Sequence, residues 1–456
     1  MPRVLLQRSL AVLGIALSLS WATAAQAERL SAGPMLGDTT ETSTQIWLQT
    51  EQATRAHIEY WPEKQPQQRQ KSAVVVTSAE RFLTGLIPVT GLKAGLRYNY
   101  TLFLNDKAVE RPYPLSFSTT PVYQAGMRQP PDIKMLLGSC YYLNDPLMDV
   151  LNIPYGDGLE IFESMARHDD QMMLWLGDNV YFAPFDLSNL YNMNRRYARH
   201  RQLPQLQALL AKMPHYATWD DHDFGPNNSD RHFLRAKESL ALFKAYWTNP
   251  RYGLLLTPGI FFQKRWGDVE ILMTDNRSHR DGNSFSDPLK RQYLGPDQMA
   301  WLKNALKAST ATFKLVVVGT PVLNQNYIES FALATGEYQN LMDFLAQEKI
   351  EGVVFISGDR HHSDLMKLER PGAYPLYNYT SSPLTSEPTR LLSEAEAKDS
   401  RRVPGSLLRQ RNYGRLHVHG PQNQRVLELE AYNTAGKKIW RYSIPASRLR
   451  YPGSAN

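Results

Sequence analysis

The stretch Trp219-Asp220-Asp221-His222-Asp223 places three carboxylates and one imidazole in four consecutive positions, directly after the strand-like run 215–218. Carboxylates this close repel one another unless water or a cation compensates their charge. At the end of a strand beside a cleft, the compensating cation is often a catalytic metal. An isolated acidic turn is more commonly only hydrated, so its meaning depends on what else the chain places near it.

Similar polar clusters follow four other apolar runs of the chain. They are Gly138-Ser139-Cys140, Gly177-Asp178-Asn179-Val180-Tyr181, Asp275-Asn276-Arg277 and Ser357-Gly358-Asp359-Arg360-His361-His362. Layered α/β folds place ligands just outside the carboxyl ends of their strands. Each cluster alone has an ordinary structural explanation, but five of them together favour a metal site.

The candidate ligands are chemically mixed. Thiolate and imidazole groups prefer transition metals, whereas carboxylates and amides accept harder ions. A pocket with both types predicts two ions of different character, about 3.5–4 Å apart, that clamp the attacking and leaving oxygens of a displacement. Arg277 suits a phosphate oxygen because its planar guanidinium donates two hydrogen bonds at once.

Taken together, these motifs resemble the alkaline phosphatase D (PhoD-like) family, a distant branch of the calcineurin-like metallophosphoesterases. The resemblance covers roughly residues 133–385. It implies two bound metal ions, Fe(III) and Ca(II), that are bridged by Asp178. It implies an iron-type site completed by Cys140, Tyr181 and His361. It implies a second, calcium-like ion held by Asp221 and Asp359.

The resemblance also implies roles around the substrate. His222 is expected beside the phosphate, as an acid or a charge stabiliser for the leaving oxygen. Arg277, together with Asn227 or Asn228, is expected to grip the phosphate. Motif spacing alone favours His361 over His362 as ligand. Which ion Asp359 holds stays open, as do the parts played by Asp220 and Asp223.

Residues from about 132 onward alternate apolar strands with amphipathic helices, which predicts an α/β layered domain. The resemblance implies a metallophosphoesterase-type β-sandwich core flanked by helices over residues 132–446. Helices are expected at 157–167, 296–307 and 341–347, with Asp157 capping the first. The charge-dense stretch 394–402 is expected to be a surface excursion.

Residues 28–124 have short strand patterns separated by turn signals. This spacing predicts a small all-β domain, and Leu92 with Tyr98 and Tyr100 resembles the corner of a fibronectin III-like sandwich. A linker with proline and glycine follows at about 121–131. A chain of 456 residues is long enough for two domains, in agreement with this division.

The first 27 residues have the pattern of a cleaved signal peptide. Arg3 and Arg8 flank its start, 10–18 is apolar, and Ala25-Gln26-Ala27 resembles a cleavage site. A twin-arginine pair is absent, since Gln7-Arg8 stands in its place. We therefore expect an exported protein, periplasmic or extracellular, with no stable membrane anchor.

The amino-acid composition indicates the class of protein and the binding partners to expect. The chain is 42% hydrophobic and 21% charged, the range of a globular protein. Its net charge of +7 comes without a long Lys/Arg run, so nucleic-acid binding is not expected. The single cysteine, Cys140, is a buried hydrophobe, an exposed thiol or a metal-bound thiolate.

The leading hypothesis is a secreted, metal-dependent phosphoesterase that hydrolyses phosphate mono- or diesters and acts as a monomer. The alternative is a non-catalytic, metal-stabilised exported binding protein, in which the N-terminal sandwich binds the partner. The sequence does not choose between monoesters and diesters. Phe182, Phe185 and Tyr191 either wall the pocket or belong to the core.

Overall fold

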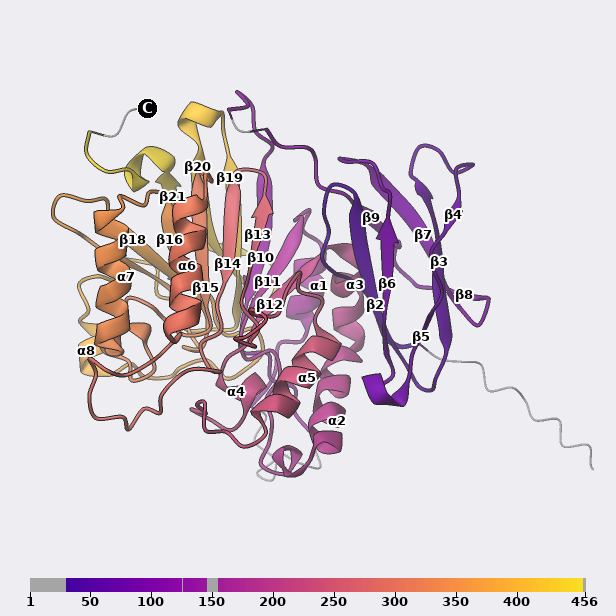
Figure 1. Ribbon diagram of the computed structural model, residues 1–456, viewed down its shortest axis with the longest axis horizontal. Coiled ribbons are helices and arrows are strands. Elements are labelled where there is room, and N and C mark those ends of the chain that lie inside the picture. Colours follow the sequence, from indigo (N-terminus) through magenta and orange to yellow (C-terminus); the bar gives the residue numbers. More distant parts are fainter. Residues whose placement is uncertain (1–29, 125, 146–154, 454–456) are drawn as a thin grey trace, which may run out of the picture.

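The computed structural model describes residues 30–124, 126–145 and 155–453. Figure 1 shows an all-β N-terminal domain, in indigo and violet, beside a larger domain of sheets and helices. The predicted signal peptide, residues 1–27, lies outside the described residues. Within the described ranges, no helix combines the length and the apolarity needed to cross a bilayer.

The N-terminal domain is a sandwich of two antiparallel sheets, so the predicted all-β fold is confirmed. Along the strand Arg97–Leu104 buried residues alternate with half-buried or exposed ones, which turns one face of its sheet inward. Ile46 and Ile87 from one sheet meet Ile58 and Tyr100 from the other in a common core. The first sheet contains β1 (Leu30–Leu36), β2 (Ser43–Thr50) and β6 (Thr84–Thr90). The second contains β3 (Arg55–Pro62), β4 (Gln70–Lys71), β5 (Val75–Val76), β7 (Arg97–Leu104), β8 (Lys107–Val109) and β9 (Ser116–Ser118).

The first sheet of the larger domain has the order β12-β11-β10-β19-β20-β21. Its first three strands run parallel, and β19 to β21 extend it in antiparallel fashion. The strands are β10 (Ile133–Gly138), β11 (Met172–Leu176), β12 (His215–Thr218), β19 (Asn412–His419), β20 (Val426–Asn433) and β21 (Lys438–Pro445).

The second sheet has the order β13-β14-β15-β16-β18-β17, with parallel central strands and antiparallel strands at its edges. Its central strands are buried along their whole length, as expected where a parallel sheet is covered on both faces. The strands are β13 (Phe262–Trp266), β14 (Val269–Met273), β15 (Phe313–Val318), β16 (Val353–Ser357), β17 (Asp364–Leu368) and β18 (Leu376–Thr380).

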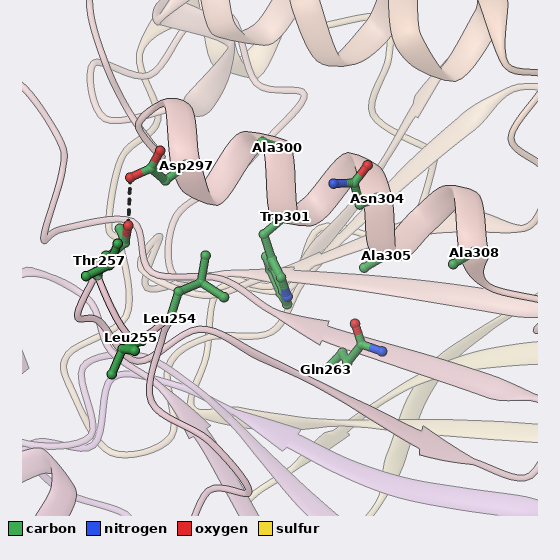
Figure 2. Close-up of a pocket in the computed structure, with 11 residues that line it drawn as sticks. Leu254, Leu255, Thr257, Gln263, Asp297, Ala300, Trp301, Asn304, Ala305 and Ala308 are labelled. Carbon is green, nitrogen blue, oxygen red and sulfur yellow. Dashed lines mark hydrogen bonds between the residues drawn. The ribbon is translucent and has the colours of Figure 1, made fainter.

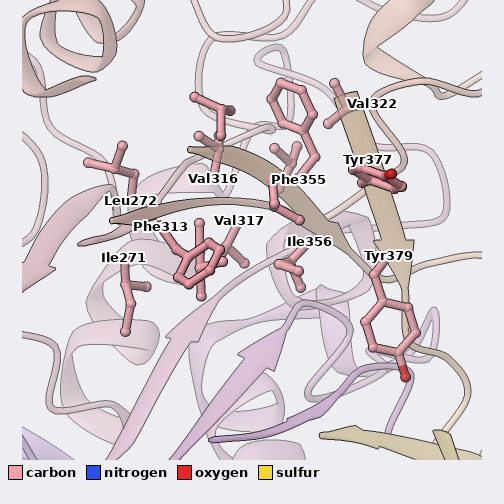
Figure 3. Close-up of a cluster of buried hydrophobic side chains, with 14 of the residues drawn as sticks. Ile271, Leu272, Phe313, Val316, Val317, Val322, Phe355, Ile356, Tyr377 and Tyr379 are labelled. Carbon is pink, nitrogen blue, oxygen red and sulfur yellow. The ribbon is translucent and has the colours of Figure 1, made fainter. Parts of the chain in front are cut away.

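The two sheets pack face to face, and helices cover their outer faces (Figure 1). Along β11, Met172 and Leu174 join the core between the sheets, whereas Met173 and Trp175 face the helices on the other side. Figure 3 shows part of the core, where Val316 and Phe355 of the second sheet lie close together. The helices beside the first sheet are α1 (Glu160–Ala166), α2 (Leu190–Arg201), α3 (Pro204–Lys212) and α5 (Ala236–Tyr246). Those beside the second are α6 (Pro296–Ala308) and α7 (Thr335–Gln347). The layered α/β prediction is therefore confirmed.

The N-terminal sandwich is fixed to the larger domain by hydrogen bonds from β1 and β2. Gly33 N donates to Gln207 Oε1 of α3 at 2.8 Å. Trp47 Nε1 donates to the Ala245 carbonyl at the end of α5 at 2.7 Å. The indole ring is 2% exposed, so its donor needs this partner. The sandwich thus buttresses the helices that lie behind the first sheet.

Two predicted helices differ from the structure in where they begin. The first helix begins at Glu160 rather than 157, because Gly158 has a φ of +73° that an α-helix does not accommodate. Asp157 does not cap it, and Leu159 occupies the capping position. α7 begins six residues before the expected start at 341. The stretch 394–402 is exposed or half-buried except at Glu396, as expected of a surface excursion, and it contains the short helix α8 (Glu394–Ala397).

Candidate metal centre

The predicted ligands lie just beyond the carboxyl ends of strands from both sheets. Cys140 follows β10, Asp178 follows β11, and Asp221 begins α4 (Asp221–Phe224) directly after β12. Asp359 and His361 follow β16 of the second sheet. The carboxyl ends of parallel strands lie at the same edge of a sheet. In Figure 1 this edge is at the lower side, where α4 lies.

The backbone at these positions adopts a conformation that non-glycine residues rarely take. Cys140, Asp178, Asp359 and His361 have φ values of 58°, 52°, 72° and 52°. Left-handed backbone costs free energy in any residue that has a Cβ, and such residues concentrate at functional sites. The four residues therefore share a strained backbone conformation.

The first ligand group contains Cys140, Asp178 and His361, whose ligand atoms all lie within 4.8 Å of one another. The Cys140 thiol lies 3.6 Å from Asp178 Oδ2. The Tyr181 hydroxyl joins them, 3.0 Å from the same carboxylate oxygen and 3.1 Å from His361 Nε2. The four side chains predicted for the iron-type site therefore converge.

Two further groups share Asp178. One contains Asp178, Asp221 and His222, and the other contains Asp178, Asp220 and Asp359, again with ligand atoms within 4.8 Å. Asp359 therefore lies in a group with Asp220, whereas Asp221 lies in the group with His222. Asp178 belongs to all three groups, so its carboxylate lies beside the other candidate ligands of the centre.

Comparison with known proteins identifies the family of the chain. The family model described as PhoD-like phosphatase matches residues 151–412, more than half of the chain. The chain belongs to the PhoD-like phosphatase family. The alkaline phosphatase D of Bacillus subtilis (strain 168) is 21% identical in an alignment of 250 positions that covers 44% of this chain and 43% of that relative. The match therefore spans less than half the length of the curated relative.

Solved structures share the fold of this PhoD-like chain. A structure of PhoD superposes with a TM-score of 0.76 at 17% identity, over 94% of this chain and 92% of that chain. A purple acid phosphatase from yellow lupin (Lupinus luteus) seeds gives a TM-score of 0.65 at 10% identity, over 90% and 74% of the two chains. Residues 27–122 match a family described only as a domain of unknown function, DUF7800.

Burial and crowding disfavour negative charge in the PhoD-like centre. Burial, then the charge of Asp221, raises the pKa of Asp178 well above its usual range. Burial, then Asp220, does the same to the pKa of Asp359. Burial also raises the pKa of the Cys140 thiol to about 12. A bound cation opposes each of these shifts, because it favours the ionised form of every ligand.

Asp221 differs from its neighbours. Burial opposes its ionisation, but His222 and Arg277 outweigh burial and lower the pKa of Asp221. The Asn228 backbone N–H also donates to its Oδ2 at 2.6 Å. Asp221 is thus stabilised as a carboxylate by the protein itself.

The buried oxygens of the centre fit a cation. Among the described residues, Asp220 Oδ2 and Asp359 Oδ2 are buried and have no hydrogen-bond partner. A buried carboxylate oxygen without a partner is costly, and metal coordination removes that cost. The donor set of thiol, phenol, imidazole and carboxylates matches two ions of different character.

Arg277 does not reach the open side of the centre. Its guanidinium is fully buried, with Nε donating to Asp220 Oδ1 at 2.6 Å and Nη1 donating to Glu329 Oε1 at 3.1 Å. Nη1 also donates to the Ser229 carbonyl at 3.1 Å. The donors expected to grip phosphate are therefore occupied by protein oxygens.

His222, Asn227 and Asn228 surround the accessible side. The His222 ring stacks on Tyr181 with 4.2 Å between ring centroids, and its side chain is 21% exposed. Asn227 and Asn228 are exposed on the loop after α4. Asp223 supports this loop, because Asp220 N donates to its Oδ2 at 3.0 Å in a capping box and Asn179 N donates to its Oδ1 at 2.9 Å.

Of the two adjacent histidines, only His361 faces the centre. Its Nε2 meets Tyr181, while its Nδ1 lies 2.8 Å from the Glu387 carbonyl. A hydrogen bond at one ring nitrogen orients the other toward a metal. His362 is buried elsewhere, with Nε2 3.6 Å from Asp364.

Two polar groups at the centre escaped the sequence analysis. The Tyr155 hydroxyl lies 3.2 Å from His361 Nδ1. The Ser382 hydroxyl donates to Cys140 Sγ at 3.1 Å. Ser382 comes two residues after β18 (Leu376–Thr380), a buried strand that the sequence analysis did not identify. Tyr155 does not follow a strand of the described residues, so it lacked this signal.

The cavity in Figure 2 lies apart from this chemistry. It has a volume of about 790 Å³ and shares no residue with the ligand groups. Its lining is mainly apolar, with Trp301 and three leucines, Leu254 to Leu256. Its one carboxylate, Asp297, accepts a hydrogen bond from the Thr257 hydroxyl at 2.6 Å (Figure 2). We therefore take the ligand groups at the carboxyl ends of the strands, and not this cavity, as the candidate functional site.

Proposed function

We propose that this chain is an exported, metal-dependent phosphoesterase that hydrolyses phosphate mono- or diesters. The observation that carries the proposal is the membership of Asp178 in three overlapping ligand groups. A two-metal phosphoesterase needs a pair of ions close enough to act on one phosphoryl group, and a shared carboxylate supplies that closeness.

The side chains divide into two sets of ligands. We assign Fe(III) to Asp178 with Cys140, Tyr181 and His361, because thiolate and imidazole suit a transition metal. We assign Ca(II) to Asp178 and Asp359 with the carboxylates of residues 220 and 221, because Ca(II) takes oxygen ligands. When bound, such ions activate water and stabilise the attacking and leaving oxygens.

The remaining residues act on the substrate or on the ligands. His222 donates a proton to the leaving oxygen, supported by its exposed edge and by Asp221, whose Oδ2 lies 4.0 Å from Nε2. Asn227 donates a hydrogen bond to a phosphate oxygen from the exposed loop. Arg277 holds Asp220 in place rather than binding phosphate, in agreement with its buried ion pair.

Residues 1–27 support export to the periplasm or outside the cell, through the signal-peptide pattern of the sequence. We propose a monomer whose partner is a phosphate ester. No nucleic acid and no stable membrane anchor are part of the proposal.

Hydrolysis of a chromogenic aryl phosphomonoester and of the matching diester, with and without a chelator, tests the function. We expect turnover of at least one ester, loss of turnover in chelator, and recovery when metal returns. Metal analysis of the purified protein should find iron and calcium. Asp178→Asn should lose both metal and turnover, because the bridging charge is gone.

Asp268→Asn is the matched control. Asp268 is also fully buried, but it pairs with Arg425 and belongs to no ligand group. This variant should lose stability and keep its metal. Full ester hydrolysis by Asp178→Asn would reject the proposed centre, whereas metal binding without hydrolysis of either ester would favour a non-catalytic binding protein.

A further inference from the structure

A second cluster of metal-type side chains lies far from the catalytic edge, on the hairpin of β19 and β20. His417 and His419 are two positions apart on β19, so their side chains lie on the same face of the sheet. Glu428 of β20 is paired directly with His417 in the strand register. The turn between these strands lies at the upper end of Figure 1, while α4 lies toward the lower end.

The three side chains are already close together. One ring nitrogen from each histidine and one Glu428 oxygen lie within 4.8 Å of one another. His419 Nε2 is 3.7 Å from Glu428 Oε1, and the two imidazole centroids are 4.6 Å apart. Metal–ligand bonds of about 2.0–2.2 Å in a tetrahedral site place neighbouring donor atoms about 3.3–3.6 Å apart, so small side-chain rotations suffice.

A further carboxylate lies beside the cluster. Asp132, at the start of the larger domain, has Oδ2 3.4 Å from His417 Nε2. It is the nearest fourth donor, and its distance matches the spacing that a single ion requires. Its other oxygen lies 3.9 Å from Arg425, which is mainly engaged with Asp268.

Few positively charged side chains compete with a metal ion at His417, His419 and Glu428. Lys134, paired with His417 in the register, is bonded to Asp169 at 2.7 Å. Arg441 Nη1 lies 3.5 Å from Glu428 Oε1 and is the one competing cation at that oxygen among the described residues. Burial, then His419, lowers the pKa of His417, which favours the neutral imidazole that a metal binds.

We propose that His417, His419 and Glu428 form a second metal site, separate from the catalytic centre, for a divalent transition cation of the Zn²⁺, Cu²⁺ or Ni²⁺ class. Two imidazoles and a carboxylate are the donors that such cations accept, whereas Ca²⁺ and Mg²⁺ prefer oxygen ligands. With Asp132 as fourth ligand, the ion ties the start of the larger domain to its closing hairpin. The site predicts that the metal content of the protein exceeds that of the catalytic centre.

Zinc titration of the full chain without a histidine tag, after removal of metal by a chelator, tests the site. The double variant His417→Gln/His419→Gln should bind one Zn²⁺ fewer per chain than the unmodified protein. His232→Gln is the matched control, because His232 is an exposed histidine that pairs with Asp230 alone. It should bind as many Zn²⁺ as the unmodified protein.

A spectroscopic readout separates this site from the catalytic one. In the Asp178→Asn background, one equivalent of Cu²⁺ should give an electron paramagnetic resonance signal with nitrogen hyperfine splitting. The double histidine change should abolish that signal. Glu428→Gln, which keeps the shape of the side chain, should weaken Zn²⁺ binding by about 10–100-fold or more. Equal zinc stoichiometry and affinity in the unmodified protein, the double variant and Glu428→Gln would overturn the proposal.

Discussion

Arg277 binds the back of Asp220 instead of facing the open side of the metal centre. Its Nε lies 2.6 Å from Asp220 Oδ1, and both side chains are fully buried. Glu329 accepts a hydrogen bond from Nη1 on the opposite side. Asp220 is therefore held through one oxygen, while its Oδ2 has no hydrogen-bond partner among the described residues. The arginine orients a carboxylate of the centre.

Arg277→Gln should destabilise the metal-free protein by about 3–5 kcal/mol, because it leaves the buried carboxylate of Asp220 without its cation. Glu329 keeps its ion pair with Arg280 at 3.0 Å. Denaturant unfolding measures this loss. Arg425→Gln, which breaks the buried pair with Asp268, should cost a similar amount and leave metal binding intact. An arginine that gripped phosphate would behave differently: Arg277→Gln would raise KM and leave the stability of the substrate-free protein unchanged.

Tyr181→Phe should remove the phenolate contribution to the visible absorption if the first ion is Fe(III), and leave the contribution of the Cys140 thiolate. A phenolate or thiolate bound to ferric iron absorbs visible light by charge transfer, and the Tyr181 hydroxyl lies 3.0 Å from Asp178 Oδ2. Tyr155→Phe is the control, because the Tyr155 hydroxyl meets the other nitrogen of His361. It should keep the main absorption band. A fully active preparation that is colourless and free of iron would contradict the ligand set.

The sequence predicted the strand ends well, because each ligand cluster directly follows a run of buried apolar residues such as Met172–Leu176. Strand polarity then carries Asp178 and Asp359 to one edge without knowledge of the intervening loops. This explains why ligands from β11 and β16, far apart in the chain, were grouped from the sequence.

The predictions failed where distant loops decide the environment. The burial of Arg277 depends on Glu329, 52 residues later in the chain, and no local pattern links the two. Ser382 reaches Cys140 across 242 residues. The start of the first helix depends on the left-handed backbone of Gly158, which the apolar periodicity does not report.

Acidification should destabilise the fold partly through His215. Burial lowers its pKa to about 3, and its Nδ1 accepts from Trp175 Nε1 at 3.0 Å while Nε2 meets the Leu209 carbonyl at 3.1 Å. A proton on Nδ1 would oppose the indole N–H. The folded-state pKa is below the unfolded value of 6.5. The neutral imidazole therefore stabilises the fold above pH 6.5, and this contribution is lost as the pH falls from 6.5 toward 3.

At pH 5 the loss from His215 amounts to about 2 kcal/mol relative to pH 7. Denaturant unfolding at the two pH values should show that His215→Gln loses correspondingly less stability than the unmodified protein. His232→Gln, which removes an exposed imidazole, should keep the original pH dependence. The same pH dependence in His215→Gln as in the unmodified protein would exclude His215 as a source of acid sensitivity.

Gly177→Ala should disrupt the centre through the backbone that precedes Asp178. Gly177 has a φ of +99°, and a Cβ there would lie 2.8 Å from Asp220 Cβ and 3.0 Å from Asp220 N. The substitution therefore combines left-handed strain with a clash against the acidic loop. We expect a loss of about 2–5 kcal/mol in the free energy of unfolding, together with weaker metal binding, because Asp178 and Asp220 are pushed apart. Gly91→Ala isolates the strain, since Gly91 has a φ of +72° and a Cβ there meets nothing within 4 Å. That variant should lose only about 1–2 kcal/mol and keep its metal. If the two variants bind metal equally well, close approach of the strands at Gly177 is not what holds the two aspartates together.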